Sequence, residues 1–342
     1  MTFGFYEEFD LIGYFPKDIA QLLYEGNATY LNRSFQLSQI LMRAEVLGVL
    51  HAGISYKKNS KLNIGARLKI YGGGLHINTS NNSGSFTTTE DGINIYRHYL
   101  SNLDATIQSS GFFEDKTYSF NAQEVISNSF LGGNLGLGID IGFTYHYTPQ
   151  IEFTGSILDI GFVNYSKKVR KVRVFGDYVF DGIEFLFNPD NPIDYWTQLE
   201  DDIKDNVPSE ESTSSYIAWR PFKFNAAVTY SFGKSRATKS CYDITYKNYY
   251  NNAIGLQLYS ITRPLNTQFA ITAFMEKNLG EKFHAKITYT MDAYSFSNIG
   301  VGMSTQLGIF HVYGMVDNIL NLPDIVSANS VSLQFGLNLI FN

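Results

Sequence analysis

The chain has 342 residues, a formal net charge of −6 and a charged share of only 17%. This share lies well below the usual ~25%, and the lack of any basic cluster excludes a nucleic-acid-binding protein. The single cysteine, Cys241, excludes an internal disulfide framework and a multi-cysteine metal site. Aromatic residues reach 15%, almost all of them Tyr and Phe. This composition favours many strands that each turn one face to lipid, with a large soluble β-sandwich as the alternative.

Neither a membrane helix nor a signal peptide stands out in the sequence. No apolar run approaches the ~18 residues of a membrane-spanning helix, but barrel strands carry their apolar residues at every second position. Residues 2–6 follow Met1 without the basic and apolar regions of a signal peptide. Because an outer-membrane protein is exported, we expect the signal peptide to be missing from this chain. It was either removed or lost in an N-terminal truncation that would also take the first strands.

The first predicted elements are a strand over residues 3–9 and a short helix over residues 16–26. Pro16 suits the first turn of a helix, and Asp18 favours its N-terminus. Gly26 can take the left-handed conformation that ends a helix. We expect this helix to be a cap beside a barrel rather than a catalytic element.

From Glu45 onward, apolar and polar residues alternate with the period of two that marks a strand. A turn at residues 58–61 separates two such strands, and the second, over residues 62–70, has one of the clearest patterns in the chain. An Asn- and Ser-rich loop is expected at residues 79–85, with one or two strands between residues 86 and 109.

The middle of the chain starts with a short helix predicted over residues 122–130, on a loop. The strand predicted over residues 135–145 places glycines, Asp140 and Thr144 on one face. Its glycines follow a period of two without the strand–turn–helix frame of a phosphate-binding loop. We expect them to let the strand curve or to leave space in a lumen. Strands near residues 151–162 and 170–181 follow.

An acidic excursion over residues 183–219 interrupts the alternation, and residues 195–206 could form a helix. The acidic residues suggest calcium, but Asp190–Asp194 lacks the oxygen spacing and the following glycine of a calcium loop. We therefore interpret the excursion as a solvated loop.

Alternation then returns and continues to the end of the chain. Strands are expected over residues 222–232, 254–258, 269–275, 283–291, 299–307 and 310–317, with a weaker one over 241–247. The last strand covers residues 331–342 and places five apolar side chains on one face: Leu333, Phe335, Leu337, Leu339 and Phe341. An apolar-out strand with an aromatic residue beside the chain end resembles the terminal strand of bacterial outer-membrane barrels.

These patterns predict an all-β fold, a transmembrane antiparallel β-barrel of about 12 to 16 strands that forms one domain over residues 1–342. Lipid offers no hydrogen bonds, so such a sheet must close, and the strand number should be even. If the last strand runs toward the periplasm, the acidic loop lies in the periplasm when residues 241–247 form a strand, and outside when they do not.

No catalytic, cofactor or metal motif is present. The six histidines are scattered, and no nucleophile elbow or phosphate loop appears. We therefore predict that the protein is not an enzyme and binds no cofactor or metal.

Charged residues on the polar faces of the predicted strands are more informative. Unpaired charges cannot lie in a dry interior, so these residues either line water or pair with one another. The first arrangement is a polar pathway, and the second is a salt-bridged packing that closes the barrel. The lumen-facing candidates are Arg67, Lys69, Asp140, Lys223, Glu276, Lys286 and Asp292.

Four stretches together resemble a family of Bacteroidota outer-membrane barrels of unknown function: residues 8–20, 65–69, 294–300 and 317–320. That family is distantly similar to the long-chain fatty-acid transporter barrels and to barrel components of type IX secretion. The resemblance implies an outer-membrane location but carries over no functional residue.

Two functions follow as hypotheses. The first is a transport channel for small or hydrophobic molecules. The second is a structural or type IX secretion-associated barrel that acts through its loops and partner proteins. The expected partners are outer-membrane lipid and either a small hydrophobic ligand or secretion-system proteins, with no nucleic acid.

Overall fold

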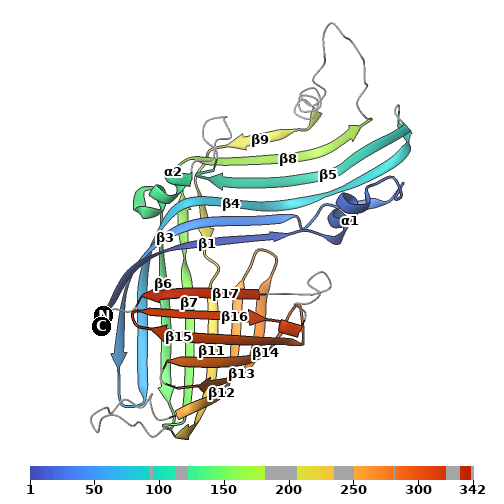
Figure 1. Ribbon diagram of the computed structural model, residues 1–342. Coiled ribbons are helices and arrows are strands. Elements are labelled where there is room, and N and C mark those ends of the chain that lie inside the picture. The colour runs from blue at the N-terminus through green and yellow to red at the C-terminus, as the bar shows by residue number, and fades with distance from the viewer. Residues whose placement is uncertain are drawn as a thin grey trace.

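The computed structural model describes residues 1–92, 95–112, 122–181, 206–234, 250–280, 282–320 and 332–339. Within these residues the chain forms one antiparallel sheet of 17 strands with three short helical segments (Figure 1). This confirms the predicted fold class, an all-β antiparallel sheet of the transmembrane-barrel type. None of the described helices has the length and apolarity to cross a membrane.

The elements have the following bounds. The strands are β1 (Thr2–Tyr14), β2 (Ser34–Gln36), β3 (Leu41–Lys57), β4 (Leu62–Gly92), β5 (Ile95–Ser110), β6 (Asn134–His146), β7 (Ile151–Tyr165), β8 (Val169–Phe180), β9 (Ser209–Ser212), β10 (Tyr216–Trp219), β11 (Lys223–Lys234), β12 (Tyr250–Thr262), β13 (Thr267–Asn278), β14 (Phe283–Asp292), β15 (Asn298–Leu307), β16 (Phe310–Asp317) and β17 (Ser332–Leu339). The helical segments are α1 (Lys17–Glu25), α2 (Ala122–Ser127) and the irregular helical turn η1 (Asn128–Gly132).

Several strands are collinear segments of one longer strand. β6 pairs with the first part of one edge of β4, and β5 pairs with the rest of that edge. On the other side of these two strands, β7 pairs with β6 and β8 pairs with β5, so that β7 and β8 together form the next position of the sheet. β10 and β11 both pair with β7, and β9 pairs with β8. β2 pairs with β4 beyond the end of β3. The described strands therefore occupy twelve positions: β1, β2/β3, β4, β5/β6, β7/β8, β9/β10/β11 and then β12 to β17 singly. Twelve is even and lies within the predicted range.

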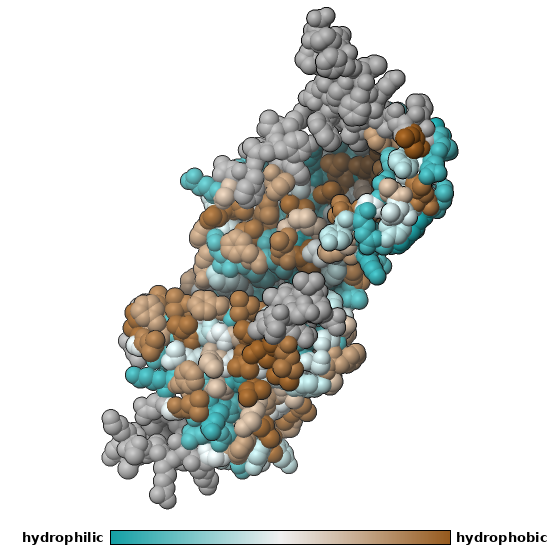
Figure 2. Space-filling view, turned by 45° about the vertical axis from the view of Figure 1, so that its right-hand side comes forward, coloured by the Kyte–Doolittle hydropathy of each residue, from teal (hydrophilic) through white to brown (hydrophobic). Residues whose placement is uncertain are grey.

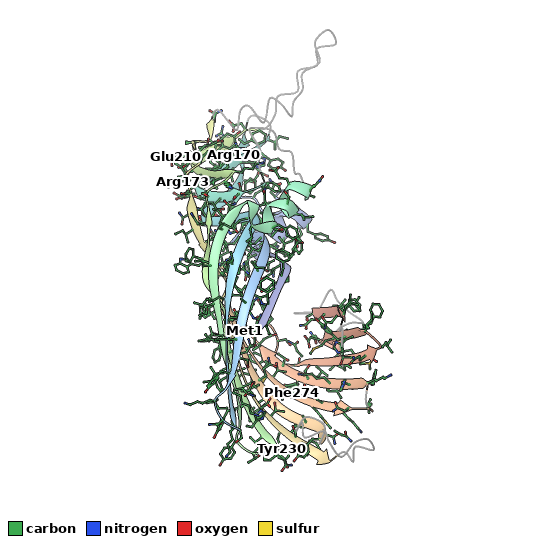
Figure 3. All side chains as sticks on the ribbon, turned by 90° about the vertical axis from the view of Figure 1, so that its left-hand side faces the viewer. Met1, Arg170, Arg173, Glu210, Tyr230 and Phe274 are labelled. Carbon is green, nitrogen blue, oxygen red and sulfur yellow. The ribbon has the colours of Figure 1, made fainter. Side chains whose placement is uncertain are left out.

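The two edge positions have compatible directions. In the described residues β1 pairs only with β3, and β17 pairs only with β16. Because all twelve positions alternate in direction, β17 runs antiparallel to β1. Figures 1 and 3 show the two edge strands on the open side of the curved sheet. This is the relative direction that closure of an antiparallel barrel requires.

The outer face of the sheet carries a broad band of exposed apolar side chains, which we call the apolar belt. Leu68 on β4 is 67% exposed and Leu333 on β17 is 75% exposed. Register places the belt residues of neighbouring strands side by side, as with Ile70 and Leu137. The belt includes Ile54, Ile64, Leu68, Ile70, Leu135, Leu137, Ile141, Phe143, Ile254, Leu256, Leu258, Phe269, Ile271, Met275, Ile287, Leu333, Phe335, Leu337 and Leu339. Figure 2 shows such apolar side chains gathered over the lower part of the molecule.

Beyond the belt, the sheet continues as an upper extension, formed by β2, β5, β8, β9, the part of β4 after Gly74 and the parts of β1 and β3 that lie beside it (Figure 1). The prediction of a loop at residues 79–85 is therefore wrong, because these residues belong to β4. Two parts of the predicted acidic loop, Ser209–Ser212 and Tyr216–Trp219, are also strands. Both faces of a strand outside the belt can meet water, so it does not need the apolar alternation on which the prediction relied. The strand predicted at residues 241–247 lies outside the described residues. The helix predicted at residues 195–206 also lies outside them, apart from its last residue, 206.

Helix α1 packs at the end of the upper extension, as a cap on the side opposite the short turns. The Nδ2 atom of Asn27, just after α1, donates to Thr88 Oγ1 at 3.0 Å. The same Asn27 Nδ2 lies 3.3 Å from His98 Nδ1. Burial lowers the pKa of His98. Asp18 of α1 pairs with Arg33 at 3.0 Å and accepts the backbone N–H of Gln36 on β2 at 2.9 Å. The predicted cap at residues 16–26 thus lies against β2, away from the belt.

A buried junction joins the belt to the upper extension. Asn134, at the start of β6, donates to Ser110 Oγ at 2.9 Å and accepts the backbone N–H groups of Ser166 and Lys167 at 2.8 Å each. Ser110 Oγ in turn donates to the carbonyl of Lys167 at 2.8 Å. These bonds connect the ends of β5 and β6 with the linker between β7 and β8, so backbone groups are satisfied where two strands are interrupted.

Three glycines make room for α2 and η1 on the outer face. A Cβ atom added to Gly48 or Gly72 would overlap with the carbonyl oxygen of Ser129, and one added to Gly74 would overlap with that of Val125. Val125 itself is buried against Ala44 and Leu75. The glycines are therefore needed for the close approach of the helical segment to the sheet.

We expect Gly72→Ala to lower the free energy of unfolding by about 1–3 kcal/mol, because overpacking must displace the Ser129 backbone. The measurement is urea unfolding in detergent, followed by heat-modifiable gel mobility. Gly65→Ala is the matched control on the same strand, where the added Cβ would meet only the Ile54 carbonyl oxygen at 3.7 Å. Equal stabilities of the two variants would contradict the packing described here.

Candidate functional site

Four of the predicted lumen-facing residues meet on the inner face of the sheet. Arg67 and Lys69 lie two residues apart on β4, so both side chains project from the same face. Register pairs Arg67 with Asp140 of β6, and their side chains approach to 3.7 Å. Lys223 projects from β11 onto the same inner face and reaches the same group of charges.

Lys69 holds two carboxylates together. Its Nζ lies 2.9 Å from Asp140 Oδ1 and 2.5 Å from Asp159 Oδ1. Asp159 lies at a register shift between β6 and β7 with a φ of 60°. A bulge of this kind changes the direction of a side chain, and here it turns Asp159 inward. The Asp159 backbone N–H donates to Asp140 Oδ1 at 2.8 Å, so the bulge also orients the second carboxylate.

The charges continue from Asp159 toward β1 and β3. Lys223 Nζ lies 3.1 Å from Asp159 Oδ2 and 3.5 Å from Glu8 Oε1. Arg220 pairs with Glu8 at 3.0 Å and with Glu45. We call this set the ion-pair network: Glu8, Glu45, Arg67, Lys69, Asp140, Asp159, Arg220 and Lys223.

Tyrosine hydroxyls provide further partners for the acidic members of the network. The hydroxyl of Tyr71 donates to Asp159 Oδ1 at 3.2 Å, and that of Tyr165 donates to Glu45 Oε1 at 2.9 Å. Both tyrosines belong to a buried cluster with Leu47, Val49, Val163 and Val169. The network therefore lies directly beneath an apolar core.

Most of the network is closed to solvent. The side chains of Arg220 and Glu45 are each 1% exposed, and those of Lys69 and Asp159 are 3% and 4% exposed. Burying an unpaired charge costs several kcal/mol, so such groups persist only with close partners. The described part of the inner face is thus filled by paired charges at this level.

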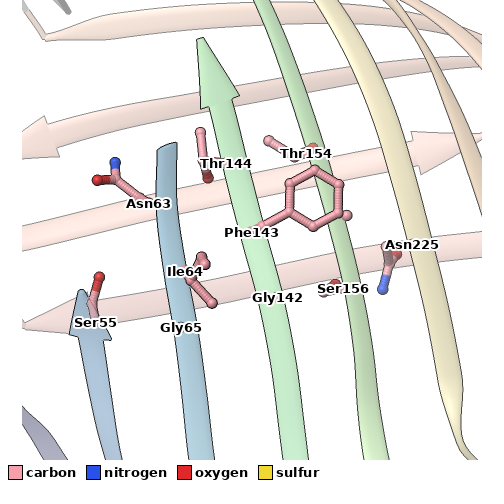
Figure 4. Close-up of a pocket in the computed structure, with 11 residues that line it drawn as sticks. Ser55, Asn63, Ile64, Gly65, Gly142, Phe143, Thr144, Thr154, Ser156 and Asn225 are labelled. Atoms are coloured by element: carbon pink, nitrogen blue, oxygen red, sulfur yellow. The ribbon is translucent and has the colours of Figure 1, made fainter. Parts of the chain in front are cut away.

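Arg67 is the most exposed member, with 43% of its side chain exposed, and Lys223 and Glu8 are partly exposed. Arg67 lines a cavity of about 300 Å³ together with Asp140. That cavity adjoins a second one of about 350 Å³, which we call the vestibule (Figure 4). The polar side chains that line the vestibule are Ser55, Asn63, Thr144, Thr154, Ser156 and Asn225. Water can therefore reach the network from the end of the sheet that carries the turns at residues 58–61 and 147–150.

The remaining predicted residues lie elsewhere. Glu276 and Lys286 face each other across β13 and β14 and form an ion pair at 2.8 Å, with both side chains partly exposed. Asp292 lies at the end of β14, where its Oδ1 accepts the backbone N–H groups of Tyr294 and Ser295 at 2.8 Å each. These contacts stabilise the β14–β15 turn.

Sequence reasoning missed Glu8, Glu45, Asp159 and Arg220. Glu8 and Glu45 do alternate with apolar neighbours, so the period of two could have placed them on the inner face. Asp159 and Arg220 carry no such signal, since one lies in a bulge and the other between β10 and β11.

His76 is a second buried polar group of the inner face. It is 2% exposed, its Nδ1 lies 2.8 Å from the Tyr216 hydroxyl, and its ring stacks on Tyr165 at 4.5 Å. In the described ranges, no group of three His, Cys, Asp or Glu residues is placed to hold a metal ion. The inner face there is an ion-paired surface.

Comparison with known proteins gives a family match and distant structural similarities. Residues 1–317 match the family of unknown function DUF5723. No curated protein is similar in sequence. The solved structures that resemble the chain include the toluene transporters TbuX of Ralstonia pickettii (8% identity, TM-score 0.40) and TodX of Pseudomonas putida (10%, 0.36). Each of these alignments covers 92% of this chain and 72% of the transporter. A mutant porin of Rh. blastica is 11% identical with a TM-score of 0.25, over 98% of this chain and 100% of the porin. These similarities are too distant to transfer a ligand or a mechanism.

We expect Lys69→Met to lower the free energy of unfolding by about 3–5 kcal/mol, because it leaves two buried carboxylates without their shared cation. Arg67→Gln removes a cation from the same strand, but a partly exposed one, and should cost less than about 1 kcal/mol. Urea unfolding of both variants provides the comparison. If Lys69→Met were as stable as Arg67→Gln, the network would not be a buried structural element.

Proposed function

The chain belongs to the family of unknown function DUF5723, and we propose that it is an outer-membrane β-barrel that passes small molecules. One observation supports this proposal above the others. On the strands whose outer face forms the apolar belt, the inner face carries paired charges, and the vestibule with its polar side chains lies beside these charges. An apolar exterior around a polar interior is the pattern of a membrane barrel rather than of a soluble sheet.

The length of the belt supports a membrane location. On β4 its exposed residues extend from Ile64 to Ile70, preceded by the partly exposed Leu62. On β6 they extend from Leu135 to Phe143, followed by the partly exposed Tyr145. Tilted strands need ~9–11 residues to cross the hydrocarbon region. A sheet of this kind is stable in lipid only when its edges are paired, because lipid supplies no hydrogen bonds to β1 or β17.

The connections support an orientation. Short turns at residues 58–61, 147–150, 279–282 and 308–309 lie at the end of the sheet where β17 finishes. Residues 235–249 connect β11 and β12 at the same end but lie outside the described residues. Bacterial barrels have short periplasmic turns and longer external loops. We infer that β17 ends at the periplasm and that the upper extension, including the two ends of the acidic segment, is extracellular.

The inner face favours hydrophilic cargo. The vestibule is lined by hydroxyl and amide side chains together with Ile64 and Phe143, and the partly exposed guanidinium of Arg67 lines the cavity that adjoins it. The hydrophobic cargo suggested by the sequence resemblance would meet Ile64 and Phe143 as the large apolar residues of this lining. Because the buried charges are all paired, the described inner face is a closed state, and passage requires the network to open.

The upper extension supports a second candidate function, a barrel that acts through partner proteins. It projects beyond the belt and carries ion pairs of its own, such as Arg173 with Asp104 at 2.9 Å. This guanidinium holds the pKa of Asp104 below its usual range. A charged sheet outside the membrane is a surface for a protein partner, which could include secretion components.

Single-channel recording in planar bilayers tests the transport proposal. The double variant Lys69→Met/Asp140→Asn removes one cation and one anion, and with them the Lys69–Asp140, Lys69–Asp159 and Arg67–Asp140 ion pairs. Asp159 keeps Lys223 and Tyr71 as partners. We expect a higher single-channel conductance than in the unmodified protein, because fewer ion pairs then hold the inner face closed.

The matched control is Lys286→Met/Glu276→Gln, which removes an ion pair of the same net charge on β13 and β14. Its conductance should stay close to that of the unmodified protein. If all three proteins fold, as judged by heat-modifiable mobility, and none conducts, the transport proposal fails and the partner-dependent candidate remains.

A further inference from the structure

The helical segment between β5 and β6, residues 122–132, lies on the outer face of the sheet. On β3 and β4 the outward positions of the belt end at Leu50 and Ile70, and the next outward positions are Gly48 and Gly72. The Ser129 backbone packs on these two glycines. The segment therefore begins where the apolar belt ends, on the side of the upper extension.

Contacts with β1 fix the segment against the sheet. Phe130 stacks on Phe5 with ring centroids 4.7 Å apart and an interplanar angle of 17°. Ser129 Oγ donates to Glu7 Oε1 at 2.9 Å. The helical segment thus has a defined position relative to the belt and is not a free loop.

Three large apolar side chains of the segment remain exposed. Ile126 is 45% exposed, Phe130 is 57% exposed and Leu131 is 40% exposed. The belt continues directly beside them, because Phe5 stacks on Phe130 and Leu135 follows three residues after Gly132. These side chains extend the apolar surface of the belt outward by one helical layer.

The backbone of the segment meets the requirements of a lipid environment. Ser129 Oγ lies 2.7 Å from the Ile126 carbonyl oxygen, and the Gly133 N–H donates to the Asn128 carbonyl at 3.1 Å. Lys167 Nζ donates to the Gly132 carbonyl at 3.1 Å. Irregular backbone is tolerated near lipid only when its polar groups find such partners.

Charged groups border the segment on the side of the upper extension. Lys168 forms an ion pair with Glu124, and the neighbouring Lys167 reaches the end of η1. Basic side chains beside an apolar surface are typical of the boundary between acyl chains and headgroups, where their ammonium groups stay hydrated.

We propose that residues 122–132 form an interfacial lipid anchor, in which Ile126, Phe130 and Leu131 enter the outer edge of the acyl-chain region. This inference rests on the proposed membrane barrel. A short amphipathic segment that lies flat at the interface buries its apolar face at the boundary of headgroups and acyl chains. The anchor would fix the height of the barrel in the bilayer at the junction between the belt and the upper extension.

Tryptophan fluorescence in vesicles of phosphatidylcholine brominated on its acyl chains tests the anchor. The sequence has two tryptophans, Trp196 and Trp219. Trp219 is 70% exposed and projects outward beside Phe162. In a Trp196→Phe background, Trp219 therefore reports insertion of the belt. Adding Trp219→Phe and Phe130→Trp moves the reporter to the anchor and keeps an aromatic ring on Phe5.

We expect lipid bromines to quench both reporters. Bromines near the headgroups should quench the reporter at position 130 more than bromines near the bilayer centre. Ile126→Trp in the same background is a second reporter that leaves the Phe5–Phe130 stack intact and should behave alike. Tyr24→Trp on α1, where the native side chain is 92% exposed, is the control and should not be quenched.

The outcomes separate the anchor from the barrel. Quenching at Trp219 without quenching at positions 126 and 130, with those reporters open to aqueous iodide, would overturn the anchor alone. Shielding of those positions from both lipid and iodide would also overturn it and would indicate a protein contact. No quenching at Trp219 in a folded, vesicle-bound protein would overturn the membrane barrel itself.

Discussion

The shared cation of Lys69 is the constraint on which the inner face depends. Two carboxylates from β6 and β7 lie close together in a nearly dry environment, and like charges at such a distance repel strongly unless a cation lies between them. Lys69 supplies that cation from β4, and Lys223 and Arg220 extend the pairing to β1 and β3. Six neighbouring positions of the sheet, from β1 to β11, are thereby held in one register, and the tyrosines above them gain fixed acceptors.

A second feature, the junction near Asn134 and Gly72, divides the sheet into two environments. Below it, the outer face is apolar and the inner face is polar. Above it, the strands extend as a water-exposed sheet. Two strands are interrupted at this level, and buried side chains replace the missing backbone partners. The glycines there leave room for a helical segment on the outside, so the interruption in the strands and the helical layer are parts of one packing arrangement.

These two features bear on function together. A paired and buried network fills the described inner face, while the vestibule and the exposed part of Arg67 leave its lower side open to water. In the proposed membrane barrel, lipid covers the outer face and strand partners cover the edges of β1 and β17. Both are needed for the same reason, because apolar surface and unpaired backbone groups are unfavourable where they are left exposed. Under the proposed function, the permeability of the barrel depends on how these inner charges are arranged.

The sequence by itself determined the strands of the belt, because a sheet between lipid and a polar interior requires alternation at every residue. Arg67, Lys69, Asp140 and Lys223 could be placed on the inner face from that alternation alone, and residues 16–26 and 122–130 could be recognised as helical. The sequence could not show that Glu276 and Lys286 form a separate pair, since alternation gives the face of a residue but not its neighbours. Only the tertiary structure turned Asp159 inward, through a bulge that breaks the period of two. It alone brought Arg220 from between two short strands into the network, and it alone showed residues 79–85 as strand, because a strand with water on both faces carries no apolar pattern.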